Sequence, residues 1–214
     1  MDNHYDQSYY DWQKKSGELG ALIDLWKFSP YIRSADTVLD FGCGGGYILE
    51  QLKCKKRYGV DISPVARREA ESRGIVMSER VQDLPADLRF DAVISHHSLE
   101  HVEDPAAVLK ALRRRMRPNA VAVHVVPIND WRNDRRYDPS DINKHLYTWT
   151  PLLLGNLFVH CGYEIEHIEI LTHAWLPLSR YTYRLLPHPL YHLLCRLFAF
   201  ATRNRQIRIV ARAV

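Results

Sequence analysis

The sequence lacks the features that mark secreted, disulfide-bonded and membrane-spanning proteins. Its four cysteines, Cys43, Cys54, Cys161 and Cys195, form no C-x-x-C pair, so we expect reduced thiols in a cytoplasmic protein. The first residues, MDNHYDQSYYDWQKK, contain no apolar signal-peptide segment. No run of ~18 uncharged apolar residues is present, which argues against a transmembrane helix. With 214 residues, the chain is expected to form one domain with a modest appendage.

Acidic residues are missing from the end of the chain. Residues 170–214 contain seven arginines and no Asp or Glu, whereas residues 1–169 hold 22 Lys and Arg against 25 Asp and Glu. The net charge of +4 is therefore a property of the last segment. This asymmetry indicates that the C-terminal part has a partner of its own.

A glycine-rich turn follows a short apolar run. The segment from residue 37 to 49 reads TVLDFGCGGGYIL, which predicts a buried strand, a tight turn and the start of a helix. Such a turn can grip a nucleotide-like ligand. The G-x-G-x-x-G pattern of dinucleotide-binding proteins fails because Tyr47 stands at its last position, which disfavours an NAD-dependent oxidoreductase. The pattern present is D-x-G-x-G-x-G, from Asp40 to Gly46.

Strands and helices alternate along the rest of the chain. We expect strands over 57–62, 75–78, 90–95, 120–126, 163–171 and 206–214, and helices over 17–28, 46–55, 63–73, 105–116 and 151–162. This alternation predicts an α/β fold with a parallel sheet and helices on both faces.

A second acid ends the next predicted strand. Asp61 follows the run RYGV and could accept hydrogen bonds from both hydroxyl groups of a ribose. The alternative is a plain turn residue before Ser63 and Pro64.

Together with the run FDAVISHHSLEHVEDP over residues 90–105, these motifs resemble the class I S-adenosylmethionine (SAM) dependent methyltransferases. The similar branch includes the ubiquinone-biosynthesis (type 11/type 23) methyltransferases, and the match covers about residues 36–170. The resemblance implies a Rossmann-like, seven-stranded, mostly parallel sheet with an antiparallel last strand. It also implies SAM as cofactor and S-adenosylhomocysteine as product. We expect an N-terminal helical lid over 1–30 and a methyltransferase domain over 31–214, with a helical insert at 174–204. Alternatively, the aromatic residues of segment 1–30 could simply pack against the domain.

The resemblance further implies which residues contact the cofactor. Asp83 falls where the family binds the adenine amino group, although Asp before Leu84 and Pro85 is also ordinary turn chemistry. The expected contacts are Asp40, Gly42, Cys43, Gly44, Gly46, Asp61, Ile62, Asp83, Leu84, Ser95, His96 and Tyr10.

Histidines cluster where the acceptor would react. Methylation of an oxygen requires removal of its proton, and histidine is the usual base near neutral pH. We expect His97 or His145 to be this base. Alternatively, His97, Glu100, His101 and His145 could bind a divalent metal, although His97 replaces the first glutamate of the E-x-x-E-H run of metal-dependent relatives. A non-catalytic SAM-binding module is the other alternative. His124, within a predicted strand, is expected to be structural.

The sequence contains no motif that identifies the methyl acceptor. The motifs for methylation of nucleobases, arginine side chains and C5 of cytosine are missing, so no nucleic-acid partner is expected and a small-molecule, saccharide or lipid-linked acceptor is favoured. The long loop 127–146 and segment 174–204 would determine specificity. The pattern of segment 174–204 predicts a basic amphipathic helix. This helix could pack on the domain or form a dimer contact. Alternatively, it could act as a lid that touches the inner membrane face. We expect a monomer or homodimer.

Overall fold

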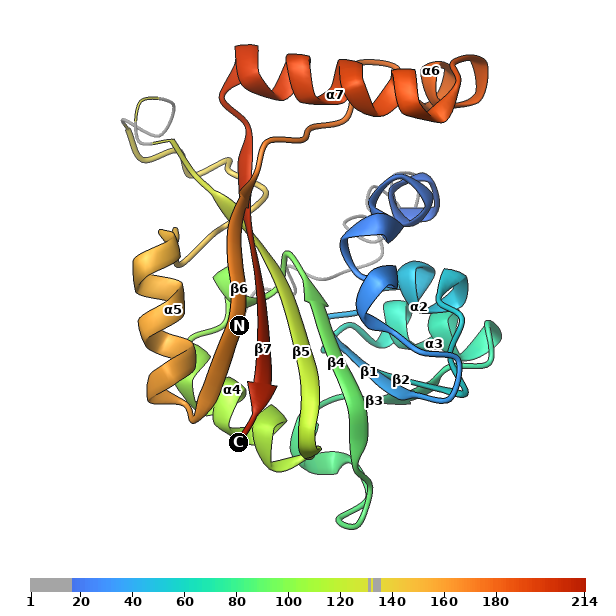
Figure 1. The fold of residues 1–214 in the computed structure, drawn as a ribbon, viewed down its shortest axis with the longest axis vertical. Coiled ribbons are helices and arrows are strands. Elements are labelled where there is room, and N and C mark those ends of the chain that lie inside the picture. The colour runs from blue at the N-terminus through green and yellow to red at the C-terminus, as the bar shows by residue number, and fades with distance from the viewer. Residues whose placement is uncertain (1–16, 131, 133–135) are drawn as a thin grey trace.

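Seven strands form a single sheet in the order β3-β2-β1-β4-β5-β7-β6 (Figure 1). The computed structural model describes residues 17–130, 132 and 136–214. The strands from β1 to β5 pair in parallel, whereas β7 runs antiparallel to both β5 and β6. This arrangement confirms the predicted Rossmann-like sheet. The strands are β1 (Thr37–Phe41), β2 (Lys56–Val60), β3 (Val76–Ser78), β4 (Phe90–His96), β5 (Met116–Ile128), β6 (Tyr163–Leu171) and β7 (Arg205–Ala213).

The helices that follow the strands begin at capped positions. Ser63, Asp104 and Thr150 each accept a hydrogen bond from the N–H three residues on, and proline follows each of them. A helix over 17–24 precedes β1 and continues into two 3-10 turns, Leu25–Lys27 and Ser29–Tyr31. The other helices are α2 (Tyr47–Gln51), α3 (Pro64–Ser72), α4 (Pro105–Arg114), α5 (Pro151–His160), α6 (Ser179–Leu185) and α7 (His188–Thr202), with 3-10 turns at Val81–Asp83 and Leu99–His101.

The sheet has a hydrophobic core on each face. On one face, Leu109 of α4 and Phe158 of α5 pack against β-strand residues such as Leu39. On the other face, Leu49 of α2 and Ala70 of α3 belong to the second core. Neighbouring strand residues point to opposite faces, so both faces of each central strand are buried, as expected for a parallel sheet covered by helices.

Strand β5 is longer than the sequence predicted. We expected it to end at Val126, but it continues to Ile128 because β7 pairs with it from Val121 to Ile128. This extension carries the strand beyond the core toward the carboxyl edge of the sheet. Helix 17–24, the 127–146 loop and the α6–α7 pair all gather at that edge (Figure 1). A functional site is expected there, because ligands of open α/β sheets bind at the carboxyl ends of the strands.

Helices α6 and α7 interrupt the chain between β6 and β7. They pack on the N-terminal helix through a small separate core made by Ile23, Tyr191 and Cys195. Trp175 strengthens this contact, since its indole N–H donates to Asp24 at 3.2 Å and its ring lies against Gly20. The N-terminal helix and the insert therefore form one joint cover over the carboxyl edge. Among the described residues, no helix is long and apolar enough to cross a bilayer.

Candidate functional site

The glycine-rich turn between β1 and α2 has a backbone that only glycine adopts freely. Gly42, Gly44 and Gly46 have φ values of +72°, +53° and +75°. A Cβ atom on Gly42 would lie 2.1 Å from the Ser98 Oγ, so no larger side chain fits there. The turn can therefore bring its backbone close to a ligand.

Two carboxylates flank this turn. Asp61 accepts hydrogen bonds from the Gly44 N–H at 2.8 Å and the Ser63 N–H at 2.9 Å, which fixes its orientation. Asp40 is buried, and its Oδ1 has no hydrogen-bond partner among the described residues. Burial, together with the charge of Asp61, raises the pKa of Asp40 well above its ordinary value. A cationic ligand beside these two acids would offset the cost of burying them.

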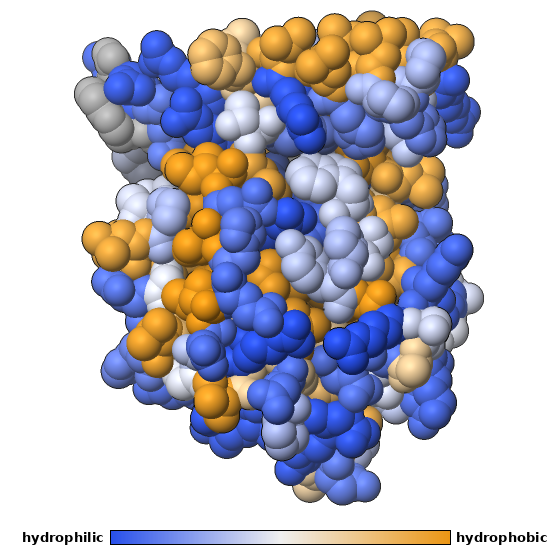
Figure 2. Space-filling model, in the orientation of Figure 1, coloured by the Kyte–Doolittle hydropathy of each residue, from blue (hydrophilic) through white to orange (hydrophobic). Residues whose placement is uncertain are grey.

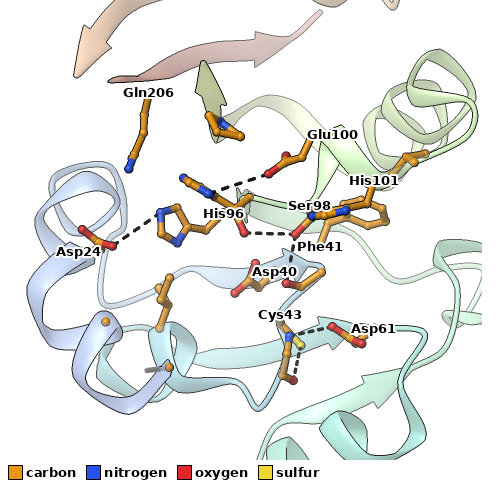
Figure 3. Close-up of a pocket in the computed structure, with 18 of the residues that line it drawn as sticks. Asp24, Asp40, Phe41, Cys43, Asp61, His96, Ser98, Glu100, His101 and Gln206 are labelled. Carbon is orange, nitrogen blue, oxygen red and sulfur yellow. Dashed lines mark hydrogen bonds and ion pairs between the residues drawn. The ribbon is translucent and has the colours of Figure 1, made fainter. Parts of the chain in front are cut away.

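A cavity of about 1110 Å³ opens beside the turn. Figure 3 shows Cys43 and Asp61 on one side of it, Glu100 and His101 on another, and His96 between Asp24 and Asp40. Ligand pockets usually measure about 300–1,000 Å³. The cavity is therefore large enough for a nucleoside cofactor and an acceptor together.

A buried lysine organises one wall of the cavity. The side chain of Lys27 is fully buried, and its Nζ forms an ion pair with Asp24 Oδ1 at 2.8 Å, donates to Gln206 Oε1 at 2.8 Å and lies 3.3 Å from His96 Nε2. Burial lowers the pKa of Lys27, and Asp24 partly offsets this. As a donor to His96 Nε2, the ammonium favours the tautomer that carries its proton on Nδ1. In this tautomer the Nδ1–H of His96 is a hydrogen-bond donor.

Glu100 and three histidines line the cavity near the end of β4. Glu100 is fully buried, both of its carboxylate oxygens lack a hydrogen-bond partner among the described residues, and burial raises its pKa to about 8. His97 Nδ1 lies 3.9 Å from Glu100 Oε1. The rings of His101 and His145 are 4.9 Å apart, and both lie close to Glu100. These four residues form one group of proton-binding side chains beside the cavity.

Comparison with known proteins decides the family. The family model described as "Methyltransferase domain" (Methyltransf_23) matches residues 13–168. This chain belongs to the class I SAM-dependent methyltransferases. The chain is 37% identical over 119 residues to "Ubiquinone biosynthesis O-methyltransferase" of Cereibacter sphaeroides, a match that covers 50% of this chain and 47% of that protein. The chain spans about half the length of the curated relatives it matches.

Solved structures share the fold across nearly the whole chain. A SAM-dependent methyltransferase of Thermotoga maritima, titled a possible histamine N-methyltransferase, has a TM-score of 0.68 at 16% identity and covers 99% of this chain and 97% of its own. A putative methyltransferase of Haloferax volcanii, solved in complex with the activator Trm112, has a TM-score of 0.67 at 18% identity and covers 97% and 98%. At such identities the likeness confirms the fold alone.

The residues of the cavity fit SAM. The cofactor carries a sulfonium and an amino group, both cationic, and a ribose with two hydroxyl groups. The glycine turn offers close backbone approach, Asp61 is fixed beside it by the Gly44 N–H, and the Oδ1 of Asp40, which has no hydrogen-bond partner among the described residues, is available to a polar or cationic group. These observations agree with SAM as the cofactor that the family implies.

The cavity brings most of the predicted site residues together. Both candidate bases, His97 and His145, are among its lining residues. The predicted cofactor contacts that line it are Asp40, Gly42, Cys43, Gly44, Asp61, Ile62 and His96.

Four predicted contacts lie just outside the lining. Gly46 is the left-handed N-cap of α2 and Leu84 is buried in the core. Asp83 accepts the Arg80 N–H at 3.1 Å, and Ser95 Oγ donates to the Phe41 carbonyl at 2.9 Å. The neighbours Arg80, Val81 and Gln82 line the cavity instead. Tyr10 falls outside the described residues.

Several lining residues had no signal in the sequence. Asp24 stands on a helix that reads as amphipathic, and Gln206 opens the last strand. Lys27 and Gln206 are 179 positions apart, so only the folded chain brings them into contact. Ser98 was also missed, although its place two residues after β4 marks it as near the carboxyl edge.

Proposed function

We propose that this methyltransferase transfers the methyl group of SAM to an oxygen of a small-molecule, saccharide or lipid-linked acceptor. The observation that carries the proposal is one cavity that joins the glycine turn and Asp61 to a cluster of histidines. The relatives are named ubiquinone biosynthesis O-methyltransferase, which supports oxygen as the acceptor atom.

The protein has to align the acceptor and remove its proton. The bound cofactor supplies an electrophilic methyl group on its sulfonium. The residues of the chain hold the acceptor in line and exclude water, and the joint cover of helix 17–24 and the insert serves the second task. A base on the acceptor side completes the set of groups that an oxygen acceptor requires.

His97 is the favoured base. Burial, with the nearby His96 and Lys27, keeps the pKa of His97 well below its ordinary value, so its imidazole is neutral and able to accept a proton at pH 7. Glu100 lies 3.9 Å from the Nδ1 of His97 and can orient the ring. His145, held by the Asn129 amide at 3.0 Å, is the alternative on the other side of Glu100.

Substitution separates the two histidines. His97→Gln is expected to lower kcat by about 10²–10⁴-fold with little effect on S-adenosylhomocysteine affinity, since a general base contributes about that much. His145→Gln should then mainly raise the KM for the acceptor. His167→Gln, on the exposed part of β6, is the matched control. The reverse pattern would assign the base to His145, and no effect from either would remove the histidine mechanism.

A metal-assisted reaction is the second candidate. Glu100, His101 and His145 each offer one ligand atom, and these atoms lie within 4.8 Å of one another. Nitrogen and oxygen ligands of this kind suit a divalent cation that orients acceptor hydroxyl groups. His97, the fourth residue suggested by the sequence, is not part of this group. Full activity after exhaustive chelation would rule out this candidate, whereas loss of activity that Mg²⁺ or Mn²⁺ restores would favour it.

Binding and turnover test the proposal as a whole. S-adenosylhomocysteine should raise the melting temperature of the protein and NAD should not. Release of S-adenosylhomocysteine from SAM with hydroxylated acceptors would establish the reaction, and binding without turnover across a broad panel would favour a non-catalytic SAM-binding module. The proposal also includes a cytoplasmic monomer or homodimer that contacts the inner membrane face peripherally through 174–204, without a nucleic-acid partner.

A further inference from the structure

The outer side of the α6–α7 pair exposes a row of large apolar side chains. On α7, Leu190, Leu193, Leu197 and Phe200 are between 42% and 72% exposed. Their spacing of three and four residues places them on one stripe of the helix. Three residues of the α6 region extend the apolar surface, namely Leu178, Tyr181 and Leu185. Figure 2 shows this surface as an apolar band along the upper edge of the molecule.

The opposite side of α7 is the one that holds the helix to the protein. Tyr191, Cys195 and Ala199 are buried at intervals of four residues. At 100° per residue these positions lie roughly opposite the exposed stripe. The exposed row is therefore not a face that the fold needs for its own packing. Apolar surface of this extent on a protein marks an interaction site.

The charged side chains that segment 170–214 brings to the apolar row are all arginines. Arg180, Arg184 and Arg196 are exposed on the two helices, and Arg203 and Arg205 follow them. Segment 170–214 contains no carboxylate side chain. Within 17–130, 132 and 136–214, none of these five arginines forms an ion pair with a carboxylate. Arg203 lies near one acid, Asp130, whose pKa it helps to lower.

We propose that the α6–α7 surface docks on an anionic phospholipid bilayer, with α7 lying in the plane of the interface. A helix with an apolar face and flanking arginines inserts its apolar side chains at the level of the lipid headgroups, while the arginines bind lipid phosphates. A second copy of the chain fits less well. A two-fold interface would bring the same arginine-rich patch of both copies together without a carboxylate from the segment.

The same insert forms part of the cavity wall. Phe198, Asn204 and Arg205 line the cavity together with His173 and Trp175. A docked protein would thus hold its acceptor pocket directly beside the membrane. This deepens and rests on the proposed function, because it selects the lipid-linked class from the three acceptor classes. The acceptor would carry an apolar anchor in the bilayer and a hydroxylated head in the pocket.

Co-flotation with vesicles tests the docking without any measurement of activity. The full chain is mixed with phosphatidylcholine vesicles, with or without phosphatidylglycerol. We expect it to float with the anionic vesicles and to stay behind with the neutral ones, and added salt should weaken the binding. Substitution of Arg180 and Arg184 by Gln should weaken partitioning about fivefold per arginine.

Apolar substitutions identify the face that inserts. Leu197→Ser with Phe200→Ser should reduce partitioning at least about tenfold. The matched control is Leu152→Ser with Leu153→Ser on α5, where the leucines are similarly exposed at 72% and 56%, and it should float normally.

The thermal shift with S-adenosylhomocysteine, measured without vesicles, shows that each variant keeps its cofactor pocket. It also separates a failure of docking from a failure of the proposed function. No flotation of the wild-type protein, equal loss in the α5 control, or a stable dimer broken by Phe200→Ser would each overturn the proposal.

Discussion

Replacing Lys27 tests how the N-terminal segment is joined to the cavity. The Lys27 Nζ lies 2.8 Å from Asp24 Oδ1, and the two side chains are 0% and 3% exposed. Lys27→Met keeps the volume and removes the charge, which leaves the Asp24 carboxylate buried with only the Trp175 indole as a donor among the described contacts. Breaking one half of a buried ion pair costs about 3–5 kcal/mol of unfolding free energy.

A double-mutant cycle isolates the pair. Asp24→Asn should cost less than Lys27→Met, because the amide oxygen still accepts from the ammonium. The double variant should recover part of the loss, since no uncompensated charge remains. We expect a coupling energy of about 2 kcal/mol or more. Urea denaturation followed by circular dichroism measures all four proteins.

Additive effects would refute this reasoning. If the double variant lost the sum of the two single losses, within about 0.5 kcal/mol, the two charges would not interact in the folded protein. If Lys27→Met had the same unfolding free energy as the wild-type protein, the Lys27 amine would not be part of a buried ion pair. The exposed pair of Arg212 and Glu166 on the outer strands is the control, and its coupling should stay below about 1 kcal/mol.

Three further predictions concern other residues of the cavity, Glu100, Gly42 and His97. Glu100 has a pKa raised from 4.5 to about 8, so the folded state binds its proton more tightly and stability falls as the pH rises through that window. We therefore compare the unfolding free energies of Glu100→Gln and wild type in denaturant titrations that contain a chelator. The difference should shift in favour of the variant by as much as about 3–5 kcal/mol from pH 5 to pH 8. The same difference at both pH values would contradict the assignment. Gly42→Ala and Gly74→Ala share a strained φ, of +72° and +76°, but only the first meets Ser98. In the same titrations, Gly74→Ala should lower the unfolding free energy by about 1–2 kcal/mol, and Gly42→Ala should lower it by at least about 1 kcal/mol more. Equal losses would mean that the turn has room for a side chain at Gly42. Because the pKa of His97 is lowered, kcat should hold down to pH values below 6.5 before it falls, and a fall centred above 6.5 would point to another base.

The parts of the structure that the sequence predicted are those encoded locally. The glycines around Gly42 predict the turn directly, because glycine adopts left-handed backbone freely. The position of Asp61 at the edge of the sheet could be predicted because this residue ends a predicted strand. The strand and helix order, and hence the parallel sheet, follow from hydrophobic period and capping residues within each segment.

The parts that it did not predict depend on contacts between distant segments. Lys27 stands on an amphipathic helix, where a charged side chain normally faces water, and only its contact with Gln206 near the end of the chain explains its burial. Similarly, His145 reaches Glu100 through a long loop whose path no local pattern fixes. The sequence suggested one group of four metal-binding residues, but among the described residues the ligand atoms within 4.8 Å of one another belong to Glu100, His101 and His145, and His97 is not part of that group.

Titration with S-adenosylhomocysteine in a calorimeter tests the central claim most directly. The wild-type protein should bind one equivalent, and Asp61→Asn should bind about 10- to 100-fold more weakly, because a hydrogen bond to a charged group contributes about 1.5–3 kcal/mol. Asp87→Asn, an exposed acid away from the cavity, should bind as the wild type does. Absence of binding to the wild-type protein, or equal affinity of the wild-type and Asp61→Asn proteins, would contradict a SAM site formed by the glycine turn and Asp61.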